Sequence, residues 1–318
     1  MPHIHVIHEN ADWTAPLLRE LDALGAPYQD WHLDKGTLDL GAPPPAGVFY
    51  SRMSASSHTR GHRYAPEFTA CVLDWLENHG ARVINPRTAL RLELSKVAQY
   101  SALRRHGIRT PRTLAAAGED ALVAAAGRMT GPFITKHNRA GKGLGVRRFD
   151  GADQLRALIE RGDYELSVDG VTLVQEYVRA PTPHITRVEF IGRRLVYAVR
   201  VDTSEGFELC PADDCGPGDA FCPVGTGASG AKFEIIGGFH HPLVREYEKF
   251  MDAEQVDVAA FEYILDENGR AYTYDINTNT NYNAGAEARA GKSGMRALAE
   301  YLLKELTRYR QAPRSHAA

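Results

Sequence analysis

The chain has 318 residues, of which 43% are hydrophobic and 24% are charged, the proportions of an ordinary globular protein. Its length exceeds the roughly 100–200 residues of one typical domain, so two or three subdomains that share a cleft are expected. A formal net charge of -3 excludes a global basic field for nucleic acid, and no apolar run approaches the ~18 residues of a membrane span.

The N-terminal segment, residues 1–8, predicts a first buried strand. It lacks the basic region, long apolar run and cleavage site of a secretory signal. The chain contains four cysteines, Cys71 alone and Cys210, Cys215 and Cys222 together. These are too few and too uneven for a secreted disulfide framework. We therefore expect a cytoplasmic protein without nucleic-acid or membrane partners.

Apolar runs alternate with amphipathic stretches over the first third of the chain, which predicts a parallel α/β sheet. Strands are expected at residues 5–7, 47–50 and 82–85, and helices at residues 13–24 and 66–78. Asn85-Pro86 then opens one helix that passes through Lys96 and Leu103. Gly107 is its natural left-handed C-cap.

The pattern changes after Gly131 to hairpins with fewer helices between them. Further strands are expected at residues 132–136, 146–149, 171–178, 187–190, 195–201, 256–265 and 271–277. Helices are expected near residues 155–159, 242–252 and 295–309. Asn268-Gly269 is a strong hairpin signal between the last two strands. The sequence as a whole predicts an α/β (α+β) fold.

A glycine-rich loop, residues 137–145, contains Gly141, Gly143 and Gly145. A dinucleotide-binding fingerprint or a P-loop requires a helix directly after such a loop. This loop instead joins two predicted strands, so we expect a mobile hairpin whose backbone N–H groups close over phosphate oxygens. An ordinary flexible turn is the alternative.

Two lysines flank this loop in the predicted structure. Lys136 ends the strand before the loop, and Lys96 lies within the long helix. A single lysine would be interpreted as a solvated surface charge, since lysines are mostly exposed. Two lysines beside a predicted phosphate loop favour phosphate binding.

Oxygen-bearing side chains gather on the last two predicted strands. Glu262 stands in an otherwise apolar strand, and Asp275 and Asn277 follow across the hairpin. Side chains alternate along a strand, so Asp275 and Asn277 share one face and Glu262 can lie opposite them. Such hard oxygen donors suit Mg²⁺ beneath nucleotide phosphates. A satisfied polar pair is the alternative, but carboxylates in so apolar a strand are costly without a cation.

These motifs together resemble the ATP-grasp superfamily, most closely its RimK-type glutamate ligases. The resemblance spans residues 85–277 and includes residues 257–262, 274–277 and 174–178 with Lys136 before the glycine loop. It implies an N-terminal pre-grasp domain, a lid and hinge subdomain, and a C-terminal subdomain with the metal ligands. The corresponding limits are residues 1–94, 95–180 and 181–318.

The resemblance also implies roles for individual residues. Lys96, Lys136 and the loop glycines would contact the phosphates of ATP. Glu262, Asp275 and Asn277 would hold two Mg²⁺ ions, which Mn²⁺ can replace. The adenine would lie at the hinge, against Gln175, Glu176 and the backbone of Tyr177 and Val178. A homodimer is common among such enzymes.

The expected chemistry is amide formation through an acyl-phosphate, with release of ADP and phosphate. Arg187 would reach the transferred phosphate or the carboxylate, and Arg187 or Arg200 would stabilise the tetrahedral oxyanion, beside Lys136. The substrate is expected to be an amino acid or a small peptide. Candidate residues for holding it are Arg52, Ser54, Asn279 and Asn281, of which the first two follow a strand of the N-terminal sheet.

The sequence departs from the RimK-type pattern in two places. An acidic residue precedes the matching arginine by two positions in that family, where this chain has Ile185 before Arg187. A segment with Cys210, Cys215 and Cys222 replaces the expected basic stretch; it could be a reduced structural loop or, with His240 or His241, bind Zn²⁺. Two other functions therefore stay open: a nucleotide- or metal-responsive binding protein with a cysteine sensor, and a ligase that uses carbonate or a thiol-bearing partner.

Overall fold

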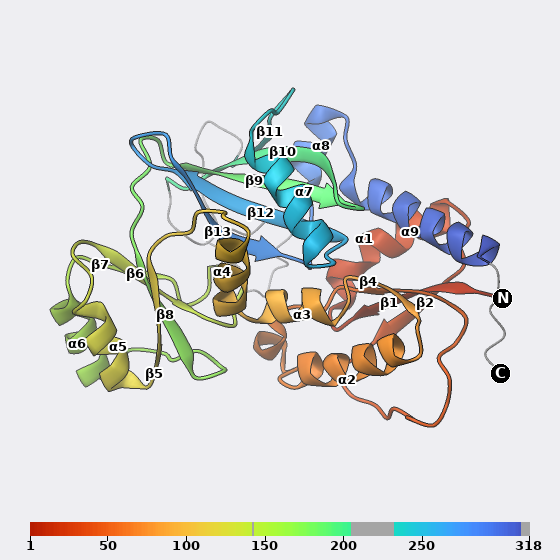
Figure 1. Cartoon of the computed structure of the whole chain (residues 1–318), viewed down its shortest axis with the longest axis horizontal. Coiled ribbons are helices and arrows are strands. Elements are labelled where there is room, and N and C mark those ends of the chain that lie inside the picture. Colours follow the sequence, from red (N-terminus) through yellow and green to blue (C-terminus); the bar gives the residue numbers. More distant parts are fainter. Residues whose placement is uncertain (142, 205–231, 313–318) are drawn as a thin grey trace.

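The structure of the chain is a computed structural model that describes residues 1–141, 143–204 and 232–312 (Figure 1). Its strands form three β-sheets, which follow one another along the chain and are covered by helices. This mixed architecture confirms the predicted fold class. Among the described residues, no helix is both long enough and apolar enough to cross a bilayer.

The first sheet is parallel, with the strand order β2-β1-β3-β4. Its strands are β1 (His3–His8), β2 (Tyr28–His32), β3 (Gly47–Ser51) and β4 (Arg82–Ile84). Side chains alternate along β1, so Val6 faces a core covered by α1 (Ala11–Ala23), while Ile7 faces a core covered by α2 (Ala65–Asn78). The predicted parallel sheet is confirmed. Strand β2 was missed because it is a half-exposed edge strand with little apolar character.

The second sheet is antiparallel, in the order β5-β8-β6-β7, and lies at the left of Figure 1. Its elements are β5 (Thr113–Ala117), α5 (Glu119–Ala126), β6 (Phe133–His137), β7 (Arg147–Phe149), α6 (Ala152–Glu160) and β8 (Val171–Glu176). Leu122 of α5 and Leu155 of α6 pack against Phe133 in a small separate core. The predicted β6–β7 hairpin around the glycine loop is confirmed. The alanine-rich β5 and α5 carry no clear apolar period, so the sequence pattern did not reveal them.

The third sheet is antiparallel, in the order β11-β10-β9-β12-β13. Its strands are β9 (His184–Ile191), β10 (Arg194–Asp202), β11 (Phe233–Ile235), β12 (Val258–Leu265) and β13 (Ala271–Asn277). Helix α7 (Leu243–Ala253) covers one face, where Tyr247 and Phe250 contact Phe261. The short helix α8 (Ala284–Ala290), which the sequence did not reveal, precedes the last helix. The cysteine-rich segment with Cys210, Cys215 and Cys222 lies outside the described residues.

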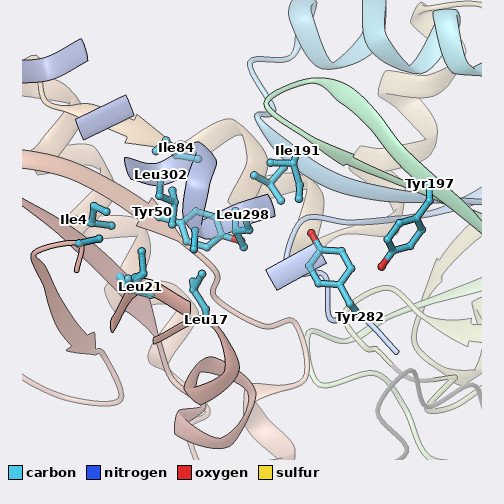
Figure 2. Close-up of a cluster of buried hydrophobic side chains, with 14 of the residues drawn as sticks. Ile4, Leu17, Leu21, Tyr50, Ile84, Ile191, Tyr197, Tyr282, Leu298 and Leu302 are labelled. Atoms are coloured by element: carbon cyan, nitrogen blue, oxygen red, sulfur yellow. The ribbon is translucent and has the colours of Figure 1, made fainter. Parts of the chain in front are cut away.

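The last helix, α9 (Gly294–Gln311), returns to the first sheet and joins it to the third. Figure 2 shows Leu298 and Leu302 of this helix among side chains of the first sheet and α1, with Ile191 of β9 nearby. All of them belong to one continuous buried cluster. The first and third sheets are therefore held together by shared apolar burial.

The helix predicted after Asn85-Pro86 is wrong in one respect, because it is two helices, α3 (Arg87–Leu94) and α4 (Lys96–Arg105). Ser95 breaks it with an extended backbone (φ -143°, ψ 111°), and its hydroxyl accepts a hydrogen bond from the Ala98 N–H. Serine favours this N-cap geometry over a helix interior. The break puts Lys96 at the first position of α4 rather than mid-helix.

Asn85 links the first sheet to the third through its buried side chain, which is 1% exposed. Its Nδ2 donates to the carbonyl oxygens of Val258 (2.8 Å) and Thr278 (2.9 Å). Its Oδ1 accepts from the backbone N–H groups of Asp257 (3.0 Å) and Val258 (2.9 Å). The residue has a positive φ of 57°, which asparagine tolerates better than most residues.

We predict that Asn85→Ala lowers the free energy of unfolding by about 2–4 kcal/mol, because it leaves buried backbone groups without partners. Asn85→Gly should lose the same hydrogen bonds but retain the permissive backbone, so it should be less destabilised than the alanine variant. Urea unfolding measures both. The control Asn268→Ala, in an exposed turn, should stay within about 0.5 kcal/mol of the native protein. A loss at Asn85 no larger than that of the control would contradict this role.

Candidate functional site

A cavity of about 430 Å³ is lined by residues of the second and third sheets and by segments that adjoin the first sheet. The part of the chain after β3 contributes Ser54 and Ser56, and β6 contributes Lys136. Arg187 of β9 and Glu262 of β12 also line it. Most of the residues singled out in the sequence therefore meet in one place.

The three expected metal ligands lie together on the third sheet. Glu262 pairs in register with Asp275, while Asn277 is the next residue on the same face of β13. Both β13 residues line the cavity, while Ile276 between them points away and is 1% exposed. Gln99 fixes the Ile276 peptide: its Nε2 donates to the carbonyl oxygen (2.7 Å), and its Oε1 accepts from the N–H (3.1 Å). Two carboxylates and an amide are thus held as neighbouring oxygen donors, a set that fits Mg²⁺.

Both lysines point to the same carboxylate end of the cavity. The Lys96 ammonium lies 2.6 Å from Asp275 Oδ1. The Lys136 ammonium donates to the Tyr274 carbonyl oxygen (3.1 Å) and lies over the ring of Tyr100, 4.9 Å from its centroid. Lys136 is only 4% exposed. Burial, reinforced by repulsion from Lys96, lowers the pKa of Lys136 to about 7.

Arg187 is buried at the centre of an ionic network. Its Nη1 donates to Glu262 Oε1 (2.8 Å), its Nε to Glu189 Oε1 (2.6 Å) and its Nη2 to Thr280 Oγ1 (2.7 Å). Glu189, two positions after Arg187, lies on the same face of β9 and pairs with it. The position two before Arg187, where the resemblance predicted an acidic residue, is Ile185.

Close contacts constrain both ends of the glycine loop. Gly143 and Gly145 have φ values of 78° and 74°, which favour glycine. A Cβ atom at Gly145 would lie 2.6 Å from the His137 ring. At the start of the loop Arg139 donates to Glu67 of α2 (2.6 Å). Gly141 and Gly143 line the cavity, whereas Gly145, the third predicted glycine, is not among its lining residues.

The segment expected to hold a base also lines the cavity, but several of its polar groups have protein partners. The Gln175 amide donates to Tyr100 and Thr113, and Glu176 accepts from the Arg112 N–H (2.7 Å). The Tyr177 N–H donates to a proline carbonyl (3.0 Å). An adenine contact here would therefore fall mainly to the backbone at Val178, and that contact stays a prediction.

The structure does not bring every candidate into the cavity. The Arg200 side chain is 50% exposed and pairs with Glu234 on β11, apart from the other candidates. Arg52 is 2% exposed and donates to Asn279 and Asn281, which line the cavity together with Ser54. Cavity residues that the sequence analysis missed, Trp13, Ser56 and Glu93, are far apart in the chain and have no local motif.

No family model matches the chain, but solved structures resemble it over nearly its whole length. A RimK domain protein ATP-grasp from Sphaerobacter thermophilus has a TM-score of 0.62 and 18% identity, over 94% of this chain and 99% of that one. The ATP-grasp ligase PsnB complexed with minimal precursor has a TM-score of 0.66 and 18% identity, over 96% and 100%. D-cycloserine synthetase DcsG has a TM-score of 0.64 and 17% identity, over 95% and 99%. The chain has the ATP-grasp fold.

One curated protein matches part of this ATP-grasp chain, the alpha-aminoadipate–LysW ligase LysX of Sulfurisphaera tokodaii. The two are 31% identical over 117 residues, which are 36% of this chain and 41% of that protein. The match thus covers less than half of the relative. The resemblance noted in the sequence is confirmed at the level of the fold, and the roles of individual site residues stay predictions.

We predict that binding of Mg·ADP to this ATP-grasp cavity takes up a proton through Lys136. With a pKa of about 7, most of the Lys136 side chain is neutral at pH 8, and a neighbouring phosphate would favour the charged ammonium. Uptake should approach one proton at pH 8 and fall towards zero as the pH is lowered below 7. Titration calorimetry at pH 8 in Tris and in HEPES, which differ in ionisation enthalpy, measures it. Lys136→Arg, which stays charged, should abolish the buffer dependence; equal heats for the native protein in both buffers would contradict the prediction.

Proposed function

We propose that this chain is an ATP-dependent carboxylate–amine ligase that forms an amide bond through an acyl-phosphate and releases ADP and phosphate. The observation that carries the proposal is the cavity itself. It places two lysines and a buried arginine against three oxygen donors, beneath a glycine hairpin and between two antiparallel sheets. This is the arrangement needed to bring an anionic carboxylate to an anionic phosphoryl group.

The donor set fits bound magnesium. Glu262, Asp275 and Asn277 would hold two Mg²⁺ ions, or Mn²⁺ in their place, which when bound would neutralise nucleotide phosphates. The Lys96 ammonium lies 2.6 Å from Asp275 Oδ1, so this carboxylate is already paired with a positive charge. PsnB, one of the proteins of the same fold, is described in complex with Mg and ADP, which supports the proposal.

The chain's own side chains would perform the remaining work. Lys96 and Lys136 would bind phosphate oxygens and offset the repulsion between the two anionic reactants. Arg187 lies in the cavity, unlike Arg200, so it is the arginine that we assign to the oxyanion of the tetrahedral intermediate. The glycine loop would exclude water, which would otherwise hydrolyse the acyl-phosphate.

The substrate is proposed to be an amino acid or a peptide. PsnB is described in complex with a precursor peptide and LysX as an alpha-aminoadipate–LysW ligase, which supports this class of substrate. We also propose that the protein is cytoplasmic and forms a homodimer.

We predict that the native protein releases ADP and phosphate when ATP and Mg²⁺ are supplied with a suitable carboxylate and amine from a panel of amino acids and dipeptides. Asp275→Asn and Glu262→Gln should reduce this release at least 100-fold, because each removes a charged metal ligand. Coupled assays for ADP and for phosphate, with product mass, measure it.

The matched control is Asp153→Asn, an equivalent change at a carboxylate that is 93% exposed on α6, which should leave the rate unchanged. Release of AMP and pyrophosphate would replace the acyl-phosphate route by adenylation. Nucleotide binding without turnover on any substrate would favour a binding protein and overturn the ligase proposal.

A further inference from the structure

Four polar side chains continue along one face from β13 towards the N-terminal sheet. Asp275, Asn277, Asn279 and Asn281 all line the cavity, at alternate positions. The threonines between them point elsewhere: Thr278 donates to a glutamate of α3, and Thr280 contacts the Arg187 network. The alternation expected of extended chain therefore persists beyond the end of the strand.

The first amide of this series presents its oxygen. Asn277 Nδ2 donates to Glu262 Oε1 at 3.3 Å. A carboxylate accepts hydrogen bonds but cannot donate them, so the nitrogen branch of the amide must face Glu262. The Oδ1 atom on the other branch is then directed away from Glu262. This orientation agrees with the proposed role of Asn277 at a cation.

The next two amides are oriented the opposite way. Arg52 Nε donates to Asn279 Oδ1 (3.3 Å), and Arg52 Nη2 donates to Asn281 Oδ1 (2.8 Å). A guanidinium has donors only, so both oxygen branches must face Arg52. The two Nδ2 groups are consequently directed away from the guanidinium. Both asparagines line the cavity, so this wall offers N–H donors.

Arg52 itself has an incomplete set of partners. It is 2% exposed, and its Nη1 is buried without a hydrogen-bond partner among the described residues. The hydrogen bonds described for its guanidinium go to the two neutral amides and not to a carboxylate. Burying a cation without a counter-ion costs free energy, so the buried Arg52 guanidinium favours an anionic ligand at this part of the site.

One carboxylate, Glu93, lines the same cavity and must be considered. Its oxygens accept from the N–H and hydroxyl of Thr278 (2.8 and 3.1 Å), from the Asn279 N–H (3.2 Å) and from the Ala55 N–H (3.4 Å). These donors favour its ionised form, but burial outweighs them and raises the pKa of the Glu93 carboxyl. The amide N–H groups backed by Arg52 therefore remain the feature that distinguishes this end of the cavity.

We propose that Asn279 and Asn281, oriented by Arg52, form a subsite for a substrate carboxylate that does not itself react. The subsite rests on the proposed ligase function and specifies its substrate class: an amino acid or peptide with a carboxylate remote from the bond being formed. That group is either the carboxylate of the amine substrate or a second carboxylate of the acid substrate. Arg52 is a positioning residue, because it acts through the two amides.

The decisive variant is Asn281→Asp. It retains an oxygen towards Arg52, changes the cavity-facing N–H₂ donor into an acceptor and adds a negative charge. The KM for the carboxylate-bearing substrate, found in the screen of amino acids and dipeptides, should rise about 10–100-fold, with the KM for ATP within twofold. The preference of the native protein for that substrate over its carboxamide analogue should disappear.

Arg52→Met should produce the same loss of preference, and Arg52→Lys should restore only part of it, since one ammonium cannot hold both amides as a planar guanidinium does. Asn268→Asp, in the exposed turn, is the control for an added carboxylate. Carboxamide analogues of the amine substrate and of the acid substrate, tested separately, distinguish the two sources of the carboxylate.

If Arg52 serves only to join β3 to the segment after β13, Asn281→Asp should keep the native KM and carboxylate preference, since the new carboxylate pairs with Arg52. That result overturns the subsite while leaving the ligase function intact. If the native protein releases no ADP with any substrate, the ligase proposal fails, and the subsite is tested by thermal shift with the same panel. A carboxylate that stabilises the native protein but not Asn281→Asp supports it, and the lack of any such compound overturns it.

Discussion

The register of β12 against its two neighbours is the constraint on which the rest of the site depends. Glu262 pairs with Asp275 of β13 on one side and with Arg187 of β9 on the other. The period-two alternation of strands puts all three side chains on the face that lines the cavity. A slip of β12 by one residue would move Glu262 to the opposite, apolar face, away from Asp275 and Arg187. Because that face packs against α7, its burial enforces the functional register.

Polarity along the cavity follows from partners fixed elsewhere in the fold. Asn277 directs its Oδ1 away from Glu262, because Glu262 accepts from its Nδ2. Asn279 and Asn281 direct their Nδ2 groups away from Arg52, because Arg52 donates to their Oδ1 atoms. The buried cations of the cavity are costly to stability, since burial lowers the pKa of Lys136 and the hydrogen bonds described for Arg52 go to no carboxylate. Ligands that bring the complementary charge would relieve this cost.

Local patterns in the sequence predicted those features that depend on neighbouring residues. Alternation placed Asp275 and Asn277 on one face opposite Glu262, and the absence of a helix after the glycine loop excluded a P-loop. These local patterns could not predict contacts between residues far apart in the chain. Nothing near Arg52 indicates that its partners lie more than 220 residues later, and nothing near α9 indicates that it covers the first sheet. The break at Ser95 was missed because an apolar helical period on both sides outweighed a single capping residue.

The distribution of buried apolar surface indicates which part of the molecule is free to move. One continuous core joins the first and third sheets through α9, whereas the second sheet packs chiefly on its own helices. The glycine loop is tied to α2 by the pair of the buried Arg139 with the half-exposed Glu67, a polar contact that is not part of a shared apolar core. Displacing the second sheet therefore disrupts far less burial than separating the other two. Lys136 and the glycine loop belong to this sheet, so we propose that a nucleotide enters by displacement of the second sheet, while the proposed metal ligands and the Arg52 wall stay in place.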